Sequence, residues 1–171
     1  MQKDPIDIML NQWTLERPDL DTSALAVVVR ILMLHKTFLR QATSALSPLD
    51  LELWEYDVLS ALRRQGKPYE LAATELARET AISTGAMTNR IDRLVARKLL
   101  HRRADLEDRR GVNVALTPNG IRMIDKAIQL RLEAANQGIS GLGRKERAQL
   151  AGLLRKVVLA AGEQKFGNGS D

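Results

Sequence analysis

The sequence predicts a mainly α-helical fold with a small β-hairpin wing, arranged as a winged helix-turn-helix. Apolar residues recur every three or four positions over most of the chain, which is typical of helices. After Lys98 the period changes, and Val112, Val114 and Leu116 alternate with less apolar residues, as in a strand. A short helix, a turn at Ala81-Ile82 and a second helix come directly before this hairpin. In such domains the second helix enters the DNA major groove.

The N-terminal half reads as five helices. The first ends before Pro18, and the second, long helix is capped by Asp21, Thr22 or Ser23 and ends at Ser47-Pro48. A third helix covers 51–62, a short fourth 73–80, and a fifth begins at Ser83 or Thr84.

The C-terminal half begins with the hairpin. Its strands are predicted at 99–103 and 112–116, with a polar loop at 104–111. Thr117-Pro118 has the N-cap and first-position residues of a helix start, and glycines at 138–143 mark the following turn. The last helix carries an apolar stripe too continuous to remain exposed, formed by Leu150, Leu153, Leu154, Val157, Val158 and Ala161.

These breaks divide the chain into four segments. We expect N-terminal dimerisation helices at 1–46, the winged helix-turn-helix at 47–117, C-terminal dimerisation helices at 118–165 and a disordered tail at 166–171.

Composition describes an ordinary globular chain with an uneven charge. The 171 residues are 44% hydrophobic and 27% charged, with no cysteine and a net charge of +5. Residues 1–62 hold five basic and nine acidic side chains, whereas 84–122 hold nine basic and four acidic ones. The basic segment favours a polyanion as partner, and a solvated charged face is the equal alternative on charge alone.

No pattern in the sequence indicates an enzyme. The two histidines, His35 and His101, lack metal-ligand spacing, and there is no nucleophile elbow or phosphate loop. We therefore expect no catalytic residue, cofactor or metal. The absence of a long apolar run or a signal-peptide pattern predicts a cytoplasmic protein with no membrane partner, and DNA as the polyanion would associate it with the nucleoid.

The fifth helix has an outward face with the side chains that read double-stranded DNA. Thr and Asn can donate and accept at base edges, Gly allows close approach, and Arg suits guanine or phosphate. The hairpin adds arginines that can enter the minor groove. The predicted DNA-binding residues are Ser83, Thr84, Gly85, Thr88, Asn89, Arg93, Arg103, Arg109 and Arg110. Asp108 and Arg110 could instead pair and hold the shape of the wing.

Two charged residues fall on apolar stripes. Asp57 lies between Trp54 and Ala61, and Arg90 lies on the inward edge of the recognition helix. A buried charge requires a partner, so these two form either a structural ion pair or part of a ligand site. Trp13 and Arg102 could face the same space. The ligand hypothesis predicts a small anionic aromatic molecule, with Arg90 coupling its binding to the DNA-reading helix.

Several of these segments resemble the MarR family of winged helix-turn-helix transcriptional regulators. Residues 108–112, 114–117 and Gly120 are similar to its wing, and residues 88–94 and 98–100 to its recognition helix and exit. The resemblance implies an intertwined homodimer on a pseudo-palindromic operator, acting as a repressor. Two-fold symmetry predicts half-sites about 10 base pairs apart.

The N-terminal segment resembles the urate-responsive branch of that family. Trp13, Asp57, Arg90 and Arg102 match its four ligand positions, and related regulators respond to phenolic acids or their CoA thioesters. The effector is therefore expected to be urate, a phenolic acid or its CoA thioester. The alternative function is a winged-helix protein-interaction module without sequence-specific DNA binding; steep salt dependence would distinguish DNA binding from it.

Overall fold

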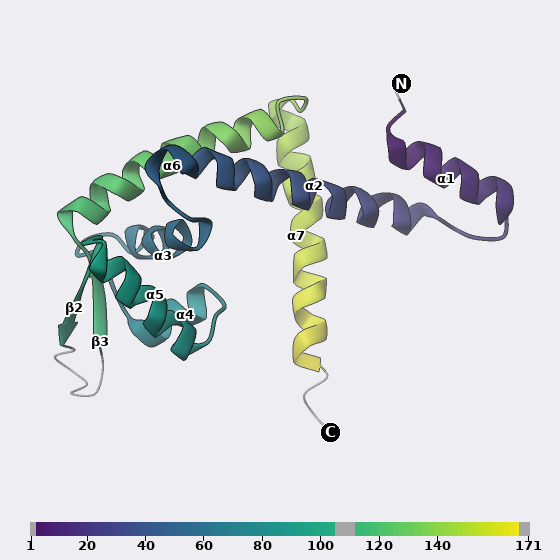
Figure 1. The fold of residues 1–171 in the computed structure, drawn as a ribbon. Helices are drawn as coiled ribbons and strands as arrows, with labels where there is room; N and C mark the ends of the chain where they lie inside the picture. The colour runs from purple at the N-terminus through teal and green to yellow at the C-terminus, as the bar shows by residue number, and fades with distance from the viewer. Residues whose placement is uncertain (1–2, 105–111, 168–171) are drawn as a thin grey trace. The chain divides into compact units, whose positions relative to one another are not determined.

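The computed structural model describes residues 3–104 and 112–167 (Figure 1). The chain forms two compact units, Met1–Ala134 and Ala135–Asp171. The first holds the N-terminal helices, the winged domain and most of α6. The second holds the end of α6 and the last helix. The mainly helical fold with a small antiparallel sheet confirms the predicted fold class.

The two N-terminal helices pack against each other. In α1 (Pro5–Glu16), the Asp4 carboxylate accepts from the main-chain N–H groups of Ile6 and Asp7 and closes a capping box. Helix α2 (Ser23–Leu46) begins after Thr22, whose side chain makes no capping bond. Arg30 of α2 joins the helices, because its guanidinium binds Asp4 at 2.8 Å and Asp7 at 2.6 Å.

The winged domain follows in the predicted order, with one additional strand. It contains η1 (Ser47–Leu49), α3 (Leu53–Arg64), β1 (Glu70–Ala72), α4 (Ala73–Glu79), α5 (Thr84–Ala96), β2 (Leu100–Ala104) and β3 (Val112–Leu116). The antiparallel sheet has the order β1-β3-β2, with Leu71 opposite Val114 and Arg102 opposite Val114 on the other side. Strand β1 was not predicted, because three residues are too few to show an alternating pattern.

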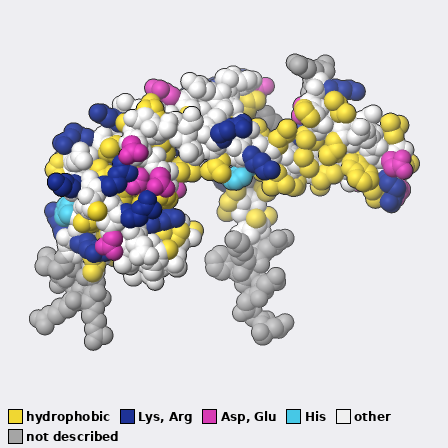
Figure 2. Space-filling view, in the orientation of Figure 1, with side chains coloured by type: hydrophobic (Ala, Val, Ile, Leu, Met, Phe, Trp, Pro, Cys, Tyr) yellow, Lys and Arg dark blue, Asp and Glu magenta, His cyan; other side chains and the backbone are white. Residues whose placement is uncertain are grey.

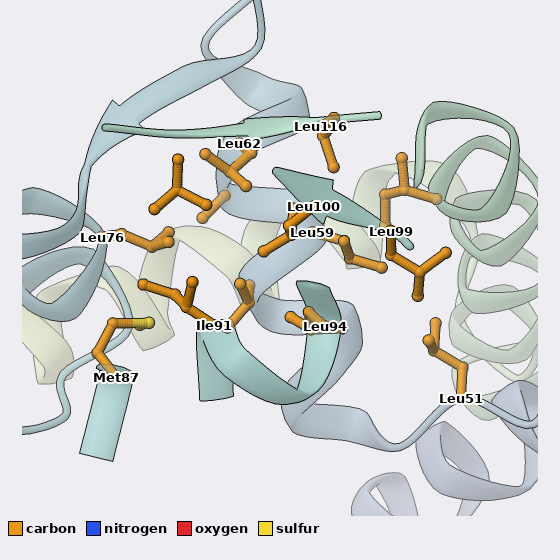
Figure 3. Close-up of a cluster of buried hydrophobic side chains, with 14 of the residues drawn as sticks. Leu51, Leu59, Leu62, Leu76, Met87, Ile91, Leu94, Leu99, Leu100 and Leu116 are labelled. Carbon is orange, nitrogen blue, oxygen red and sulfur yellow. The ribbon is translucent and has the colours of Figure 1, made fainter. Parts of the chain in front are cut away.

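One apolar core holds the recognition helix α5 in place (Figure 3). Met87, Ile91 and Leu94 of α5 are each at most 1% exposed and pack with buried side chains of α3, α4 and the sheet. Burying a large aliphatic side chain contributes about 1.5–3 kcal/mol. The inner face of α5 is therefore fixed, and its opposite face remains available.

Helix α6 (Pro118–Gly138) begins as the sequence predicts. The Thr117 hydroxyl accepts from the Gly120 N–H at 2.9 Å and donates to the Lys98 carbonyl at 2.7 Å. Gly120 lies so close to the main chain of Leu99 that a Cβ there would overlap the Leu99 carbonyl. This contact fixes the start of α6 against Leu99, the residue that precedes β2.

The second unit is built around α7 (Arg144–Gly167). Arg147 ties the turn before α7 to the end of α6, donating to the Leu142 carbonyl at 2.9 Å and to the Asn136 side chain at 3.0 Å. The helix extends to Gly167, past the predicted start of a tail at 166; residues 168–171 lie outside the described part. No helix of the described part is long and apolar enough to cross a membrane.

Candidate DNA interface and effector site

The outward face of α5 presents the residues that the sequence assigns to DNA. Ser83, Thr84, Gly85, Thr88 and Asn89 are all exposed. Ser83 is the N-cap, and its hydroxyl accepts from the Ala86 N–H at 3.3 Å. Because the buried positions of α5 fall on the other face, these five positions share one solvent-facing surface at the start of the helix.

The predicted arginines of this surface are held by acidic neighbours. Arg93 binds Glu52 at 2.8 Å and stacks on Trp54, with its guanidinium carbon 4.6 Å from the ring centre. Arg103 binds Glu70 of β1 at 3.2 Å. Arg93 and Glu52 are both more than half exposed, so this ion pair is weak enough to exchange for a DNA phosphate, whereas Glu70 is 17% exposed and holds Arg103 in a less solvated pair.

The tip of the wing lies outside the described residues, and with it the predictions for Asp108, Arg109 and Arg110. Figure 2 shows Lys and Arg side chains gathered over the winged domain among a few acidic ones, and hydrophobic side chains over α1 and α2.

Asp57 does not lie on the buried stripe of α3, and this prediction was wrong. Its side chain is exposed, whereas Glu55 is 1% exposed. The buried positions of α3 are 55 and 58–62, and its large buried apolar side chains lie at 58, 59 and 62. The error came from taking Trp54 as an inward residue; Trp54 is only partly buried and turns toward α5.

Asp57 is nevertheless surrounded by cations from three helices. Desolvation raises the pKa of Asp57 above its ordinary value, and the positive charges of Arg131, Arg90 and Arg64 oppose this rise. Asp57 and Arg90 form no ion pair in the part of the chain that the structure describes. The structural-pair alternative is therefore not realised in this chain. Arg64 is held by Glu79 at 3.3 Å, whereas Arg90 and Arg131 have no acidic partner among the described residues.

Arg131 is a residue of this cluster that the sequence did not reveal. Its buried Nε has no hydrogen-bond partner, and its guanidinium carbon lies 5.6 Å from the ring centre of Tyr56. A buried donor without a partner costs free energy unless a ligand or another group supplies an acceptor. Arg131 lies on α6, far from Asp57 in sequence, and no local pattern could have indicated the contact.

Arg102 and Trp13 are not part of this cluster within one chain. Arg102 lies on β2 and binds Asp92 of α5 at 2.8 Å. Trp13 lies on α1, and the N-terminal end of α1 is bound by Arg30 of α2. Helix α3, which carries Asp57, follows the C-terminal end of α2. A helix of 24 residues is about 36 Å long. Asp57 thus lies within reach of the positive charge of Arg90, and Trp13 lies remote from both.

Among the described residues, no group of histidine and carboxylate side chains could hold a metal ion. The described site consists of the exposed polar face of α5, the basic wing strand β2 and the arginines that act on Asp57. This combination defines a winged helix-turn-helix DNA-binding protein.

Comparisons with known proteins give the family. A family model described as "MarR family" matches residues 49–111. The HTH-type transcriptional regulator PecS of Dickeya dadantii is 30% identical over 149 residues, which cover 87% of this chain and 90% of PecS. The chain belongs to the MarR family and is a DNA-binding transcriptional regulator, not an enzyme.

Solved structures of MarR-family proteins agree with this family assignment. A mutant MarR from E. coli complexed with operator DNA matches with a TM-score of 0.69 and 28% identity over 80% of this chain and 96% of that one. BpsR of Bordetella bronchiseptica matches with a TM-score of 0.66 and 29% identity over 77% of this chain and 98% of that one. The DNA binding of BpsR is regulated by 6-hydroxynicotinic acid.

Proposed function

We propose that this regulator is a homodimeric repressor that binds a pseudo-palindromic operator and is released by a small anionic aromatic effector. The observation that carries the proposal is the arginine cluster around Asp57, because Arg90 belongs both to that cluster and to the recognition helix. An anion that attracts Arg90 would move the helix that reads DNA.

Exposed apolar side chains support the homodimer. In a single chain, Val28, Leu32, Leu153 and Val158 are each at least 50% exposed, and they lie on the two longest helices. Apolar surface of this extent is rarely left in water, so a second copy of the chain would cover it. The dimer would place two α5 helices on half-sites about one helical turn of DNA apart.

DNA recognition is assigned by position. The start of α5 enters the major groove, where Thr84, Thr88 and Asn89 face base edges and Gly85 permits close approach. Ser83, Arg93, Arg103, Arg109 and Arg110 contribute phosphate or minor-groove contacts, and Asp108 with Arg110 shapes the wing. Such a protein would work in the cytoplasm, in association with the nucleoid.

The effector class follows from the chemistry of the cluster. Arg90 and Arg131 supply positive charge for a carboxylate or an equivalent anion, and Tyr56 and Trp54 supply aromatic surface. The BpsR comparison supports an aromatic acid, because 6-hydroxynicotinic acid is one. Urate, phenolic acids and their CoA thioesters remain the candidates. We assign Trp13 to the effector site of the second subunit, because it is remote from Asp57 within one chain.

The test is a binding titration on the DNA upstream of the chain's own gene, in the presence of urate, salicylate, 6-hydroxynicotinate and a phenolic CoA thioester. Release by at least one of them is expected. A hundredfold weakening of DNA binding requires about 2.7 kcal/mol of coupling. The Asp57→Asn variant should keep DNA binding and alter the effector concentration needed for release, because Asp57 interacts with the same arginines. A response unchanged in both Asp57→Asn and Arg102→Ala would contradict the effector site.

A further inference from the structure

Two arginines one turn apart on the recognition helix bind two glutamates at the start of α3. Arg93 Nη2 lies 2.8 Å from Glu52 Oε1, and Arg97 Nη1 lies 2.6 Å from Glu55 Oε2. The arginines are four positions apart and the glutamates three, so each pair shares one face of its helix segment. Forming both ion pairs together restricts the rotation and axial position of α5 against α3.

The inner pair, Arg97–Glu55, is largely shielded from water. The side chain of Glu55 is 2% exposed and that of Arg97 is 32% exposed. The same Glu55 oxygen accepts from the main-chain N–H of Glu52 at 3.0 Å, which closes the capping box of α3. A buried carboxylate that loses its partner is strongly unfavourable, so α5 cannot turn away from Glu55 without cost.

Asp50 gives Arg97 a second fixed acceptor. Arg97 Nη2 donates to the main-chain carbonyl of Asp50 at 2.7 Å. Asp50 has a left-handed backbone conformation, with φ of 48°, at the end of η1. This conformation is unfavourable for a residue other than glycine, and the bond from Arg97 offsets part of its cost. Arg97 thus joins α5 both to α3 and to the turn that follows α2.

The outer pair differs, because it is exposed. Arg93 and Glu52 have side chains 60% and 59% exposed, and Trp54 donates its Nε1–H to Glu52 at 2.7 Å. The ring of Trp54 lies under both Arg93 and Arg90. An exposed ion pair contributes at most about 1 kcal/mol, so Arg93 can exchange onto a DNA phosphate. Arg97, held from two sides, cannot do so without breaking the inner pair.

We propose that Glu55 and Arg97 are positioning residues for operator recognition. They hold α5 at the rotation in which Thr84, Thr88 and Asn89 can face the major groove, and they touch no DNA themselves. The proposal rests on DNA binding by α5 and is independent of any effector. It predicts that these two residues govern discrimination between operator and other DNA more than they govern affinity for DNA as such.

The Glu55→Gln variant distinguishes a positioning role of Glu55 from a purely electrostatic one, because the two predict opposite changes in operator affinity. Removing a negative charge from the DNA-binding domain should tighten binding to every duplex if charge alone matters. Positioning predicts weaker binding to the operator. The probes are a duplex selected from a random library by the unchanged protein and a scrambled duplex of the same composition, each titrated at several salt concentrations.

We expect operator affinity of Glu55→Gln to fall at least tenfold, with scrambled-duplex affinity equal or higher. The slope of affinity against salt should not change, because no phosphate contact is lost. Arg97→Gln should lower the operator-to-scrambled ratio similarly. Its control is Arg17→Gln, which removes the same charge from an exposed ion pair with Asp19 in the loop after α1 and should leave the ratio unchanged.

A loss of folded protein would reduce binding to both duplexes equally and leave their ratio intact, so the ratio separates stability from positioning. If a single variant does not fold, the Glu55→Gln/Arg97→Gln double variant removes both charges and leaves neither buried alone. An operator-to-scrambled ratio equal to that of the unchanged protein in a folded variant would overturn the proposal. A salt slope reduced by about one would also overturn it, by showing that Arg97 contacts a phosphate.

Discussion

Arg102 of β2 and Asp92 of α5 form an ion pair of 2.8 Å that ties the wing strand to the recognition helix. Arg102 matches one of the four ligand positions that the family resemblance implies, although it lies apart from the Asp57 cluster within one chain. If it binds the effector, Asp92 competes with the effector anion for its guanidinium. Both side chains are about half exposed, and an exposed pair contributes about 0.2–1 kcal/mol. An effector that uses Arg102 therefore has a small, measurable competitor within the chain.

The Asp92→Asn variant should respond to less effector. Freeing Arg102 removes the competitor, so the half-maximal concentration of whichever probe releases the unchanged protein is expected to fall about two- to fivefold. Glu70→Gln is the matched control, since it frees the neighbouring Arg103 in the same way. If the half-maximal effector concentration changes equally in both variants, or does not change in Asp92→Asn, Arg102 does not bind the effector.

The Asp57→Asn variant should unfold at a higher temperature than the unchanged protein at pH 7. Desolvation raises the pKa of Asp57 in the folded state, so its ionisation destabilises the fold as the pH rises through that raised value. Below the ordinary value of 3.8, the carboxyl group is neutral in both the folded and the unfolded chain. The gain in melting temperature should therefore shrink as the pH approaches 4.

Glu52→Gln provides a control of opposite sign. Hydrogen bonds from Trp54 and then Arg93 lower the pKa of Glu52, so its charge stabilises the fold above the ordinary value of 4.5, and this contribution is lost as the pH falls through the lowered value. Neutralising it should lower the melting temperature at pH 7. If the melting temperatures of Asp57→Asn and Glu52→Gln changed in the same direction at pH 7, the causes assigned to the two pKa shifts would be contradicted.

Two glycines of the winged domain should respond differently to alanine. At Gly120 an added Cβ would overlap the Leu99 carbonyl, and overpacking of this kind costs about 1–3 kcal/mol. Gly85 has open space around it and lies within a helix, where alanine is favoured by about 0.5–1 kcal/mol. Gly120→Ala should lose stability in a denaturant titration. Gly85→Ala should keep or gain stability and lose operator affinity; unchanged affinity would remove Gly85 from the interface.

The order of helices and the wing strands could be predicted because they depend on local patterns. Residues only three or four positions apart predict the inward positions Met87, Ile91 and Leu94 and the helix cap at Thr117. Asp57 was misplaced because a single apolar neighbour, Trp54, shifted the assumed helix face. Trp54 is only partly buried and lies under guanidinium groups from another helix, a contact that periodicity does not report.

The contacts that organise the site link residues far apart in sequence. Arg97 meets Glu55 across 42 positions, and Arg131 approaches Asp57 from α6. Nothing in a single sequence marks which of its many arginines has a buried acidic partner. The sequence could identify the exposed reading face of α5, whose residue types are specific, but not the ion pairs that hold this face in orientation.

The Arg30→Gln variant should release α1 from α2. Arg30 binds both Asp4 and Asp7 and lowers the pKa of Asp4, so at pH 7 the link is complete and it weakens only as the pH falls below the ordinary value of 3.8. At pH 7, amide hydrogen exchange in α1 is expected to become about two- to fivefold faster, with α5 unchanged. Arg17→Gln, which breaks an exposed pair in the adjoining loop, is the control.

If α1 carries Trp13 to the effector site, Arg30→Gln should also raise the effector concentration needed for release while operator affinity stays the same. Faster exchange with an unaltered effector response would exclude Trp13 from that site.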